Sequence, residues 1–198
     1  MRFSRVAIPL FAVLLFSQVL LANSITIDFE GFPDSTILTT QYPGLTFSDA
    51  TILSAGISLN EFEFPPASGT NVVFDDGGPM SVSFASPITN FGGFFSYALP
   101  LTLQGFDATS NLIATVTSAF SNNMALSGDT GSSPNEFLQL AFAGGISSIT
   151  ITGDLAGGSF VLDDLTYTPA AALVPEPNSI YLLVSGAASL LAFRRRLL

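Results

Sequence analysis

Carboxylates are the only side chains in the middle of this sequence that could perform acid–base or metal chemistry. The chain has 198 residues and contains no His and no Cys, which excludes Ser-His-Asp and Cys-His catalytic sites and the usual zinc ligands. The five basic residues all lie near the ends, at Arg2, Arg5, Arg194, Arg195 and Arg196. A Walker-type phosphate loop needs a Lys and is excluded too.

The acidic residues leave one enzymatic option open. Fourteen of the 15 carboxylates, all except Glu176, lie between residues 25 and 170. Two of them could form a glycosidase pair, one with a raised pKa as the acid and one ionised. However, this segment has no Trp, Lys, Arg or His, which commonly orient sugar rings in such clefts. We therefore predict that the protein is not an enzyme, and a carboxylate glycosidase is the less favoured alternative.

The charge distribution also restricts the partners. The formal net charge is −10 at pH 7, and residues 25–170 contain no cationic side chain. Binding of nucleic acid requires Lys or Arg to neutralise phosphates, so nucleic acid is excluded as a partner of this segment. An anionic membrane surface is excluded as a partner of the segment for the same reason.

The N-terminal 24 residues have the three-part pattern of a signal peptide. A short basic region, Met1–Arg5, precedes an apolar run, Val6–Leu21, and the small residues Ala22 and Ser24 then flank Asn23 as in a cleavage site. A buried core helix fits this segment poorly, because arginines precede the run and a polar turn follows it. We expect the mature chain to begin near Asn23 or just after Ser24.

The C-terminal segment has three parts as well. Residues 171–179 form a linker containing Val174, Pro175, Glu176 and Pro177, and residues 180–198 are predicted to be a transmembrane helix with a basic tail. The apolar part ends at residue 193 and is short for a span, which needs about 17 to 25 residues, but arginines at its end can extend it. The arginines place the C-terminus on the cytoplasmic side of the inner membrane and the acidic domain outside.

This tail closely resembles the PEP-CTERM sorting signal of Gram-negative bacteria that make exopolysaccharide. The parts match in order over about 25 residues: Pro175-Glu176-Pro177, a short apolar helix containing Gly186-Ala187-Ala188, and Arg194–Arg196. The resemblance implies transient recognition by an exosortase, a membrane-embedded cysteine transpeptidase or protease, and release or attachment outside the cell. A plain single-pass anchor is the alternative.

Residues 25–170 are predicted to form one all-β domain, an antiparallel β-sandwich. Hydrophobic residues alternate over short segments, and Gly, Pro, Asn and Asp punctuate them, whereas no long amphipathic helix is indicated. Fifteen of the 19 phenylalanines lie here and are expected to form most of the core, and Tyr42, Tyr97 and Tyr167 are expected to pack on strands. Residues 120–136 are predicted to form a long loop. The ten expected strands cover residues 25–29, 44–53, 71–74, 80–84, 91–97, 101–106, 112–117, 137–142, 146–151 and 160–167.

The order of these segments resembles a jelly-roll ectodomain found among PEP-CTERM proteins, similar to carbohydrate-binding modules. The resemblance is carried by loose motifs in Phe29–Gly31, Tyr42–Phe47, Asn90–Phe94 and Phe160–Leu165. It implies a structural Ca²⁺ held by Glu30 and Asp163, with Asp75, Asp76 and Asp164 as less favoured ligands. Calcium takes six to eight oxygen ligands, which suits an acidic domain, but a solvated acidic surface is the slightly favoured interpretation of these carboxylates.

Together, these features predict an exported protein of the cell surface or extracellular matrix, such as a biofilm. Its domain would have a structural or adhesive role. The alternative function is a glycan-binding module that recognises exopolysaccharide.

Overall fold

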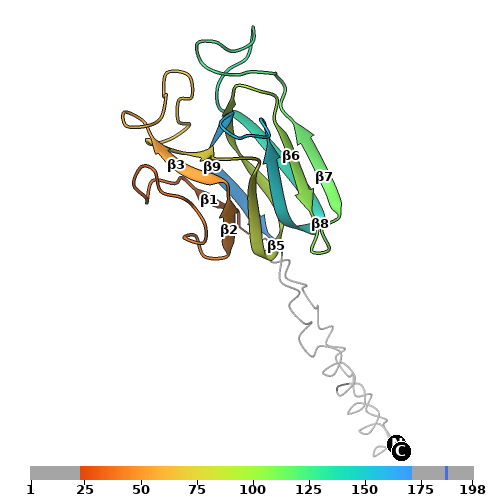
Figure 1. Cartoon of the computed structure of the whole chain (residues 1–198). Coiled ribbons are helices and arrows are strands. Elements are labelled where there is room, and N and C mark those ends of the chain that lie inside the picture. Colours follow the sequence, from red (N-terminus) through yellow and green to blue (C-terminus); the bar gives the residue numbers. More distant parts are fainter. Residues whose placement is uncertain (1–22, 171–185, 187–198) are drawn as a thin grey trace, which may run out of the picture.

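The computed structural model describes residues 23–170 and Gly186, and the described domain is all-β and antiparallel (Figure 1). Its nine strands are β1 (Ile25–Ile27), β2 (Leu45–Ser48), β3 (Ala50–Ser54), β4 (Asn71–Asp75), β5 (Met80–Tyr97), β6 (Thr102–Phe106), β7 (Leu112–Thr117), β8 (Glu136–Thr152) and β9 (Phe160–Pro169). The all-β prediction is therefore confirmed. The predicted signal peptide lies outside the described residues except for residues 23–24. The predicted transmembrane helix lies outside them except for Gly186.

The strands form one hydrogen-bonded sheet that folds over on itself. Its order is β3-β4-β9-β5-β8-β6-β7, with β1 paired to β9 and β2 paired to β5. The first layer contains β2, the first part of β5, the last part of β8, β6 and β7. The second contains β3, β4, β9, the last part of β5 and the first part of β8.

Two long bent strands connect these layers, and here the sequence-based strand boundaries were wrong. We expected residues 80–84 and 91–97 to be separate strands, as well as residues 137–142 and 146–151. Each pair is one continuous strand whose β5–β8 register shifts between Ser83 and Asn90. Pro87 and the left-handed Gly145, with φ +96°, lie at this bend. In the sequence, these residue types indicate the end of a strand.

The core lies between the two layers. Phe47, Val82 and Leu103 from the first layer and Phe91 and Phe95 from the second belong to one cluster of buried side chains. Each of these has at most 2% of its surface exposed. A Phe buried in this way contributes several kcal/mol to the free energy of unfolding. Replacing Phe95 by Ala should therefore lower that free energy by about 3 to 5 kcal/mol.

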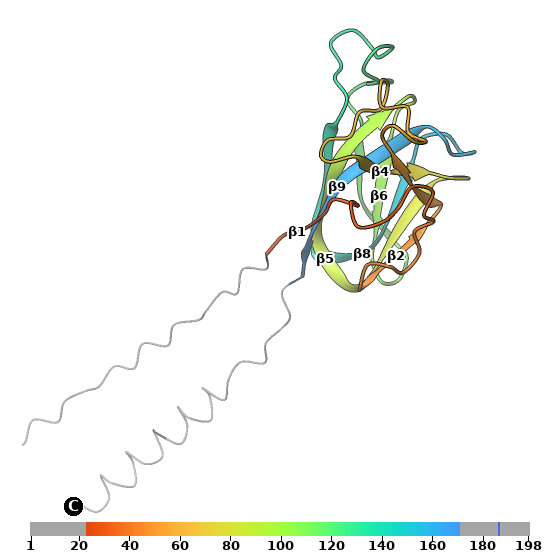
Figure 2. The ribbon, with the colours of Figure 1, turned by 90° about the vertical axis from the view of Figure 1, so that its left-hand side faces the viewer.

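The chain ends lie together at the bend end of the domain. Ile25 is the register partner of Tyr167, and the Ala170 amide donates to the Pro87 carbonyl at 2.9 Å. The segment between β7 and β8, predicted as a long loop, is irregular and extends from the opposite end (Figure 2). Among residues 23–170 and Gly186, no helix is long and apolar enough to cross a membrane.

Candidate functional site

Glu30 lies just after β1 and fastens the segment Ala67–Asn71. Its Oε1 accepts hydrogen bonds from the backbone amides of Thr70 (2.8 Å) and Asn71 (2.7 Å), and its Oε2 accepts one from the Thr70 hydroxyl (3.1 Å). Burial acts to raise the pKa of this carboxyl, but the three donors outweigh it and lower the pKa.

Asp163 in β9 holds the other end of the same segment. Its Oδ2 accepts the amides of Ala67 (2.7 Å) and Ser68 (2.9 Å), and its Oδ1 accepts that of Asp164 (2.7 Å). Asp163 is 1% exposed, and burial raises its pKa to about 6 although these amides oppose the shift. A bulge on β9 opposite β5 sets this geometry, with Asp164 in a left-handed conformation at φ 45°.

Glu30, Asp163 and the segment Ala67–Asn71 form what we call the clasp. The structure thus brings both predicted calcium ligands to one segment, and Asp164 joins them by accepting the Ser68 hydroxyl at 2.9 Å. Each oxygen of the Glu30 and Asp163 carboxylates already has a hydrogen-bond donor. No three acidic side chains of the described residues gather closely enough to hold a metal ion. The arrangement is a hydrogen-bonded fastening, and the calcium site stays a prediction.

Asp75 is a second buried carboxylate near β9. It accepts the Ser159 amide through both oxygens (2.9 and 3.1 Å), the Ser159 hydroxyl (3.0 Å) and the Phe160 amide (3.0 Å). Burial raises its pKa, and the same hydrogen bonds oppose the rise. Asp75 therefore fixes the start of β9, while Asp76 accepts the Thr51 hydroxyl at 2.9 Å and does not join the clasp.

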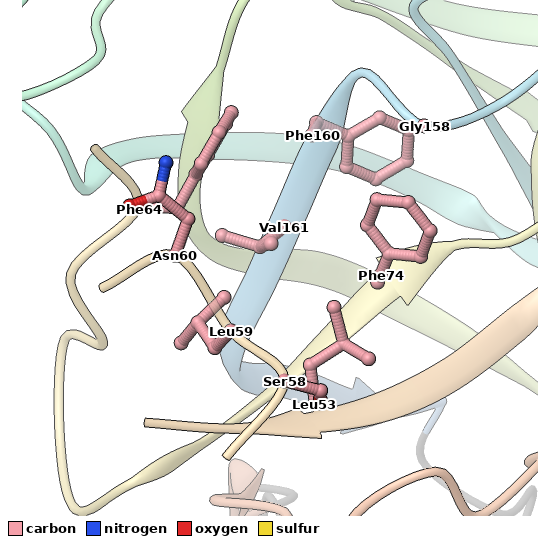
Figure 3. Close-up of a pocket in the computed structure, with 9 residues that line it drawn as sticks. All are labelled: Leu53, Ser58, Leu59, Asn60, Phe64, Phe74, Gly158, Phe160 and Val161. Atoms are coloured by element: carbon pink, nitrogen blue, oxygen red, sulfur yellow. The ribbon is translucent and has the colours of Figure 1, made fainter. Parts of the chain in front are cut away.

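A small apolar cavity lies on the outer face of β3, β4 and β9. It has a volume of about 220 Å³, and Phe64 and Phe74 lie on either side of Val161 (Figure 3). Its polar lining comes from Ser58 and Asn60, and no carboxylate lines it. Ligand sites for drug-sized molecules usually have about 300 to 1,000 Å³, so this cavity suits one small uncharged group and offers no acid or base for catalysis.

A surface of aromatic and amide side chains lies on the outer face of the second layer, on the last part of β5 and the first part of β8. The rings of Phe94 and Phe137 are 5.1 Å apart, and Phe137 is 45% exposed. The Gln139 side-chain amide donates to the Asn90 side-chain oxygen at 2.8 Å. A Cβ on Gly92 would lie 2.8 Å from the Phe137 ring, so the glycine lets that ring lie against the sheet. We call these residues the open face.

Sequence reasoning missed the open face because it assigned alternating phenylalanines to the core. Tyr97 is fully buried and Tyr42 packs on Phe29 and Phe32, as expected of packed tyrosines. Phe137, in contrast, belongs to the outward-facing set of its strand. The alternation of the buried Leu138 with its neighbours could have indicated this.

The β3–β4 loop and the β7–β8 loop are tied to each other at the end opposite the chain ends. The Glu63 carbonyl accepts the Ala125 amide at 3.0 Å, and its carboxylate accepts the amides of Leu126 (3.0 Å) and Ser127 (3.2 Å). Phe62 and Leu126 next to this tie are 72% and 76% exposed. The tie therefore fixes two apolar side chains in solvent, a placement that the sequence did not predict.

The predicted sorting and cleavage residues lie outside the described residues, except Ser24. These are Ala22, Val174, Pro175, Glu176, Pro177, Arg194, Arg195 and Arg196. The hydroxyl of Ser24 donates to the Tyr167 carbonyl at 3.5 Å. The assignments of signal cleavage and sorting therefore stay predictions.

Comparison with known proteins shows a likeness of fold only. No protein-family model and no curated protein matches the chain. The K2 cleaved adhesin domain of Lys-gingipain is 14% identical, with a TM-score of 0.47 over 74% of this chain and 99% of that one. The K1 domain of the same protein from Porphyromonas gingivalis W83 is 11% identical, with a TM-score of 0.42 over 76% and 99%.

The CBM22-1 xylan-binding domain of Xyn10C from Paenibacillus barcinonensis is 12% identical, with a TM-score of 0.42 over 78% of this chain and all of that one. At such identities and scores these likenesses describe a common type of β-sandwich and carry no information on ligand or partner.

Proposed function

We propose that this protein is exported to the cell surface or extracellular matrix, where its β-sandwich serves a non-catalytic structural or adhesive role. The observation that carries the proposal is the placement of both chain ends at one end of the domain, where Ile25 pairs with Tyr167. The signal-like segment and the Pro-Glu-Pro tail adjoin these ends. A domain attached there would present its tied loops, with Phe62 and Leu126, away from the membrane.

The charge of the domain supports an exterior location. The described domain has fourteen carboxylates and no cationic side chain, which favours solubility and repels anionic surfaces. Processing by an exosortase is part of the proposal, and its support is the resemblance of the tail alone.

Protease treatment of intact producer cells tests the proposal. We expect an epitope inserted at Ser127, in the exposed loop, to be removed from intact cells, whereas a cytoplasmic marker protein survives. The same epitope in a chain with Arg2 and Arg5 replaced by Glu should accumulate inside. Protection of the wild-type epitope until the cells are lysed would contradict a location at the cell surface.

The open face favours a second function, recognition of the producer's exopolysaccharide. The exposed Phe137 ring, packed on the half-buried Phe94 beside a hydrogen-bonded Asn–Gln amide pair, offers apolar contact for the CH groups of a sugar and hydrogen-bond partners for its hydroxyls. The protein should be retained on this polysaccharide and not on an unrelated neutral one. Phe137→Ala should abolish retention, and Phe62→Ala, which removes an exposed ring elsewhere, should leave it unchanged.

Absence of catalysis is the remaining part of the proposal. We expect the purified protein to release no reducing sugar from common polysaccharides. Hydrolysis that a single Asp or Glu substitution abolishes would contradict this.

A further inference from the structure

The two edge strands of the sheet, β3 and β7, differ in whether another segment pairs with their outer edge. At one end, the segment Ser35–Leu38 lies along β3: Ser35 donates to the Ile52 carbonyl (2.8 Å), Ile52 to Thr36 (2.9 Å) and Leu38 to Ala50 (2.9 Å). At the other end is β7, seen at the outer edge of the sheet in Figure 1. Among residues 23–170, β6 is the one segment whose backbone pairs with β7.

β7 lacks most of the features that usually protect an edge strand; the exception is a bulge at Ile113, which has no partner on β6, whereas residues 114–117 pair with β6 in regular register. Its sequence is Leu-Ile-Ala-Thr-Val-Thr, which contains no charge, no Pro and no Gly and is rich in β-branched residues. Natural edges are commonly blocked by Lys, Pro, inward charges or a covering segment. An uncovered edge of this composition accepts a further strand through its free amides and carbonyls.

The side chains of β7 divide between the two faces of the sheet. Ala114 and Val116 pair with Gly105 and Leu103 of β6 and are partly buried against the core. Leu103 is fully buried, and a Cβ on Gly105 would contact core side chains, so this is the inner face. Thr115 and Thr117 are exposed on the other side.

This division makes the strand complementary to itself. If two copies pair antiparallel about Thr115, Ala114 of each lies opposite Val116 of the other, and the half-buried inner residues cover one another. Ile113, the extra residue of the bulge, also packs against the core and lies outside this regular stretch. Since an antiparallel register fixes the faces, this alignment joins the apolar inner faces of the two domains.

Charge favours this edge over other surfaces for contact between copies. Two domains with fourteen carboxylates each repel one another, and β7 is a strand without any acidic residue. The carboxylates at the two ends of the strand are engaged: Asp107 accepts hydrogen bonds from Thr109 and Asn111 in the β6–β7 turn, and Glu136 accepts the amide of Ala119 just after β7.

We propose that β7 is a self-association site, through which two copies of this chain pair edge to edge and antiparallel about Thr115. Because the remaining carboxylates repel, added salt should strengthen the dimer, whereas it would weaken docking onto a cationic partner. The inference does not depend on export or on glycan binding.

A single engineered cysteine tests the register, since the natural chain has none. In the proposed dimer, residue 115 lies opposite its own copy, and opposite residues in an antiparallel pair have Cα atoms about 4.5 to 5.5 Å apart, within disulfide range. The full chain carrying Thr115→Cys, purified in mild detergent and oxidised, should form about tenfold more disulfide-linked dimer than the Thr117→Cys chain, a difference easily resolved on a gel.

Thr117→Cys is the matched control because it is exposed on the same face of the same strand. Its two copies would lie four residues apart along the strands, about 13 Å, which is beyond disulfide reach. Equal cross-linking of the two variants would indicate random collision and overturn the proposal. Cross-linking of Cys-bearing chain to a different protein in the producer, in place of its own copy, would overturn the choice of partner.

A second pair of variants tests pairing without oxidation. Thr115→Glu places two carboxylates opposite each other and should convert the dimer to monomer by light scattering at low salt, whereas Thr115→Gln should stay dimeric. Monomeric wild-type protein at all salt concentrations would contradict self-association.

Discussion

The β4–β9 side and the β6–β7 side of the domain use their carboxylates in opposite ways. On the first side, Asp75 and Asp163 are buried and hold neighbouring segments through backbone amides, and burial raises the pKa of both. On the second, Asp107 is only partly buried, and hydrogen bonds from Asn111 and Thr109 lower its pKa to about 2. In a domain without cationic side chains, backbone amides take the place of salt-bridge partners for the carboxylates. The degree of burial then decides whether the pKa of each carboxyl is raised or lowered.

The largest expected effect that follows from this contrast is the loss of Asp75. Replacing it by Ala leaves the amides of Ser159 and Phe160 without acceptors in a buried place, which should lower the free energy of unfolding by about 2 to 4 kcal/mol. Asp107→Ala should cost clearly less, because water can replace its carboxylate. Urea unfolding followed by circular dichroism measures both, and equal losses would mean that burial is not what distinguishes the two sides.

The next effect is a dependence of stability on pH, measured with calcium chelated. Folding raises the pKa of Asp163 from 3.8 to about 6. Its protonation therefore stabilises the folded state fully below pH 3.8, and this stabilisation is lost as the pH rises through about 6. Asp75 is shifted in the same direction. We therefore expect the melting temperature to rise on acidification from pH 7 towards pH 4.

Below that range the carboxylates with lowered pKa values should reverse the trend. Asp107, Asp34 and Glu30 have lowered pKa values, so their stabilisation is present above about pH 4 and is lost as the pH falls further. Asp163→Asn should flatten the rise between pH 7 and 4 and leave the fall below it. A wild-type melting temperature that falls steadily from pH 7 would contradict these shifts.

The last expected effect is a calcium-specific gain at the clasp, which depends on the calcium concentration. The acidic domain should be stabilised by a cation that binds the folded form, by about 2.7 kcal/mol at a concentration a hundred times its dissociation constant. Millimolar calcium should raise the melting temperature more than magnesium or sodium chloride at equal ionic strength.

Variants at the clasp sharpen this measurement. Glu30→Ala and Asp163→Ala should lower stability without calcium, because each carboxylate holds the segment Ala67–Asn71, and both should also lose the calcium-specific increment. Glu61→Gln is the matched control, since its side chain makes no hydrogen bond among the described residues. Equal rises of the wild-type melting temperature with calcium and with magnesium would mean that the clasp binds no calcium ion and is held by hydrogen bonds alone.

Much of the fold could be predicted because alternation of apolar residues is a local signal. The strand over residues 112–117 was predicted with its observed bounds, and most others were within a few residues. The expected strand over residues 44–53 is split by Asp49, which has a φ of 54°. The continuity of β5 and β8 could not be predicted, because a bend between layers contains the same residue types as a turn.

The candidate site was predictable only in part, for a related reason. Glu30 and Asp163 were identified as a pair, but their partner is the segment Ala67–Asn71, in which Ala67 and Ser68 are 96 and 95 residues away from Asp163 in the chain. Contacts of such sequence separation depend on the completed sheet. For the same reason the sequence did not reveal that Phe94 and Phe137 meet on an open face.

Mass spectrometry of the termini of the protein recovered from outside producer cells tests export and sorting most directly. The account predicts a chain that begins near Asn23 or Ile25 and ends near Pro177, because the flanking segments are removed and the described domain is kept. Recovery of only a full-length chain, from Met1 to Leu198 and retained in the membrane of cells with an active exosortase, would contradict it.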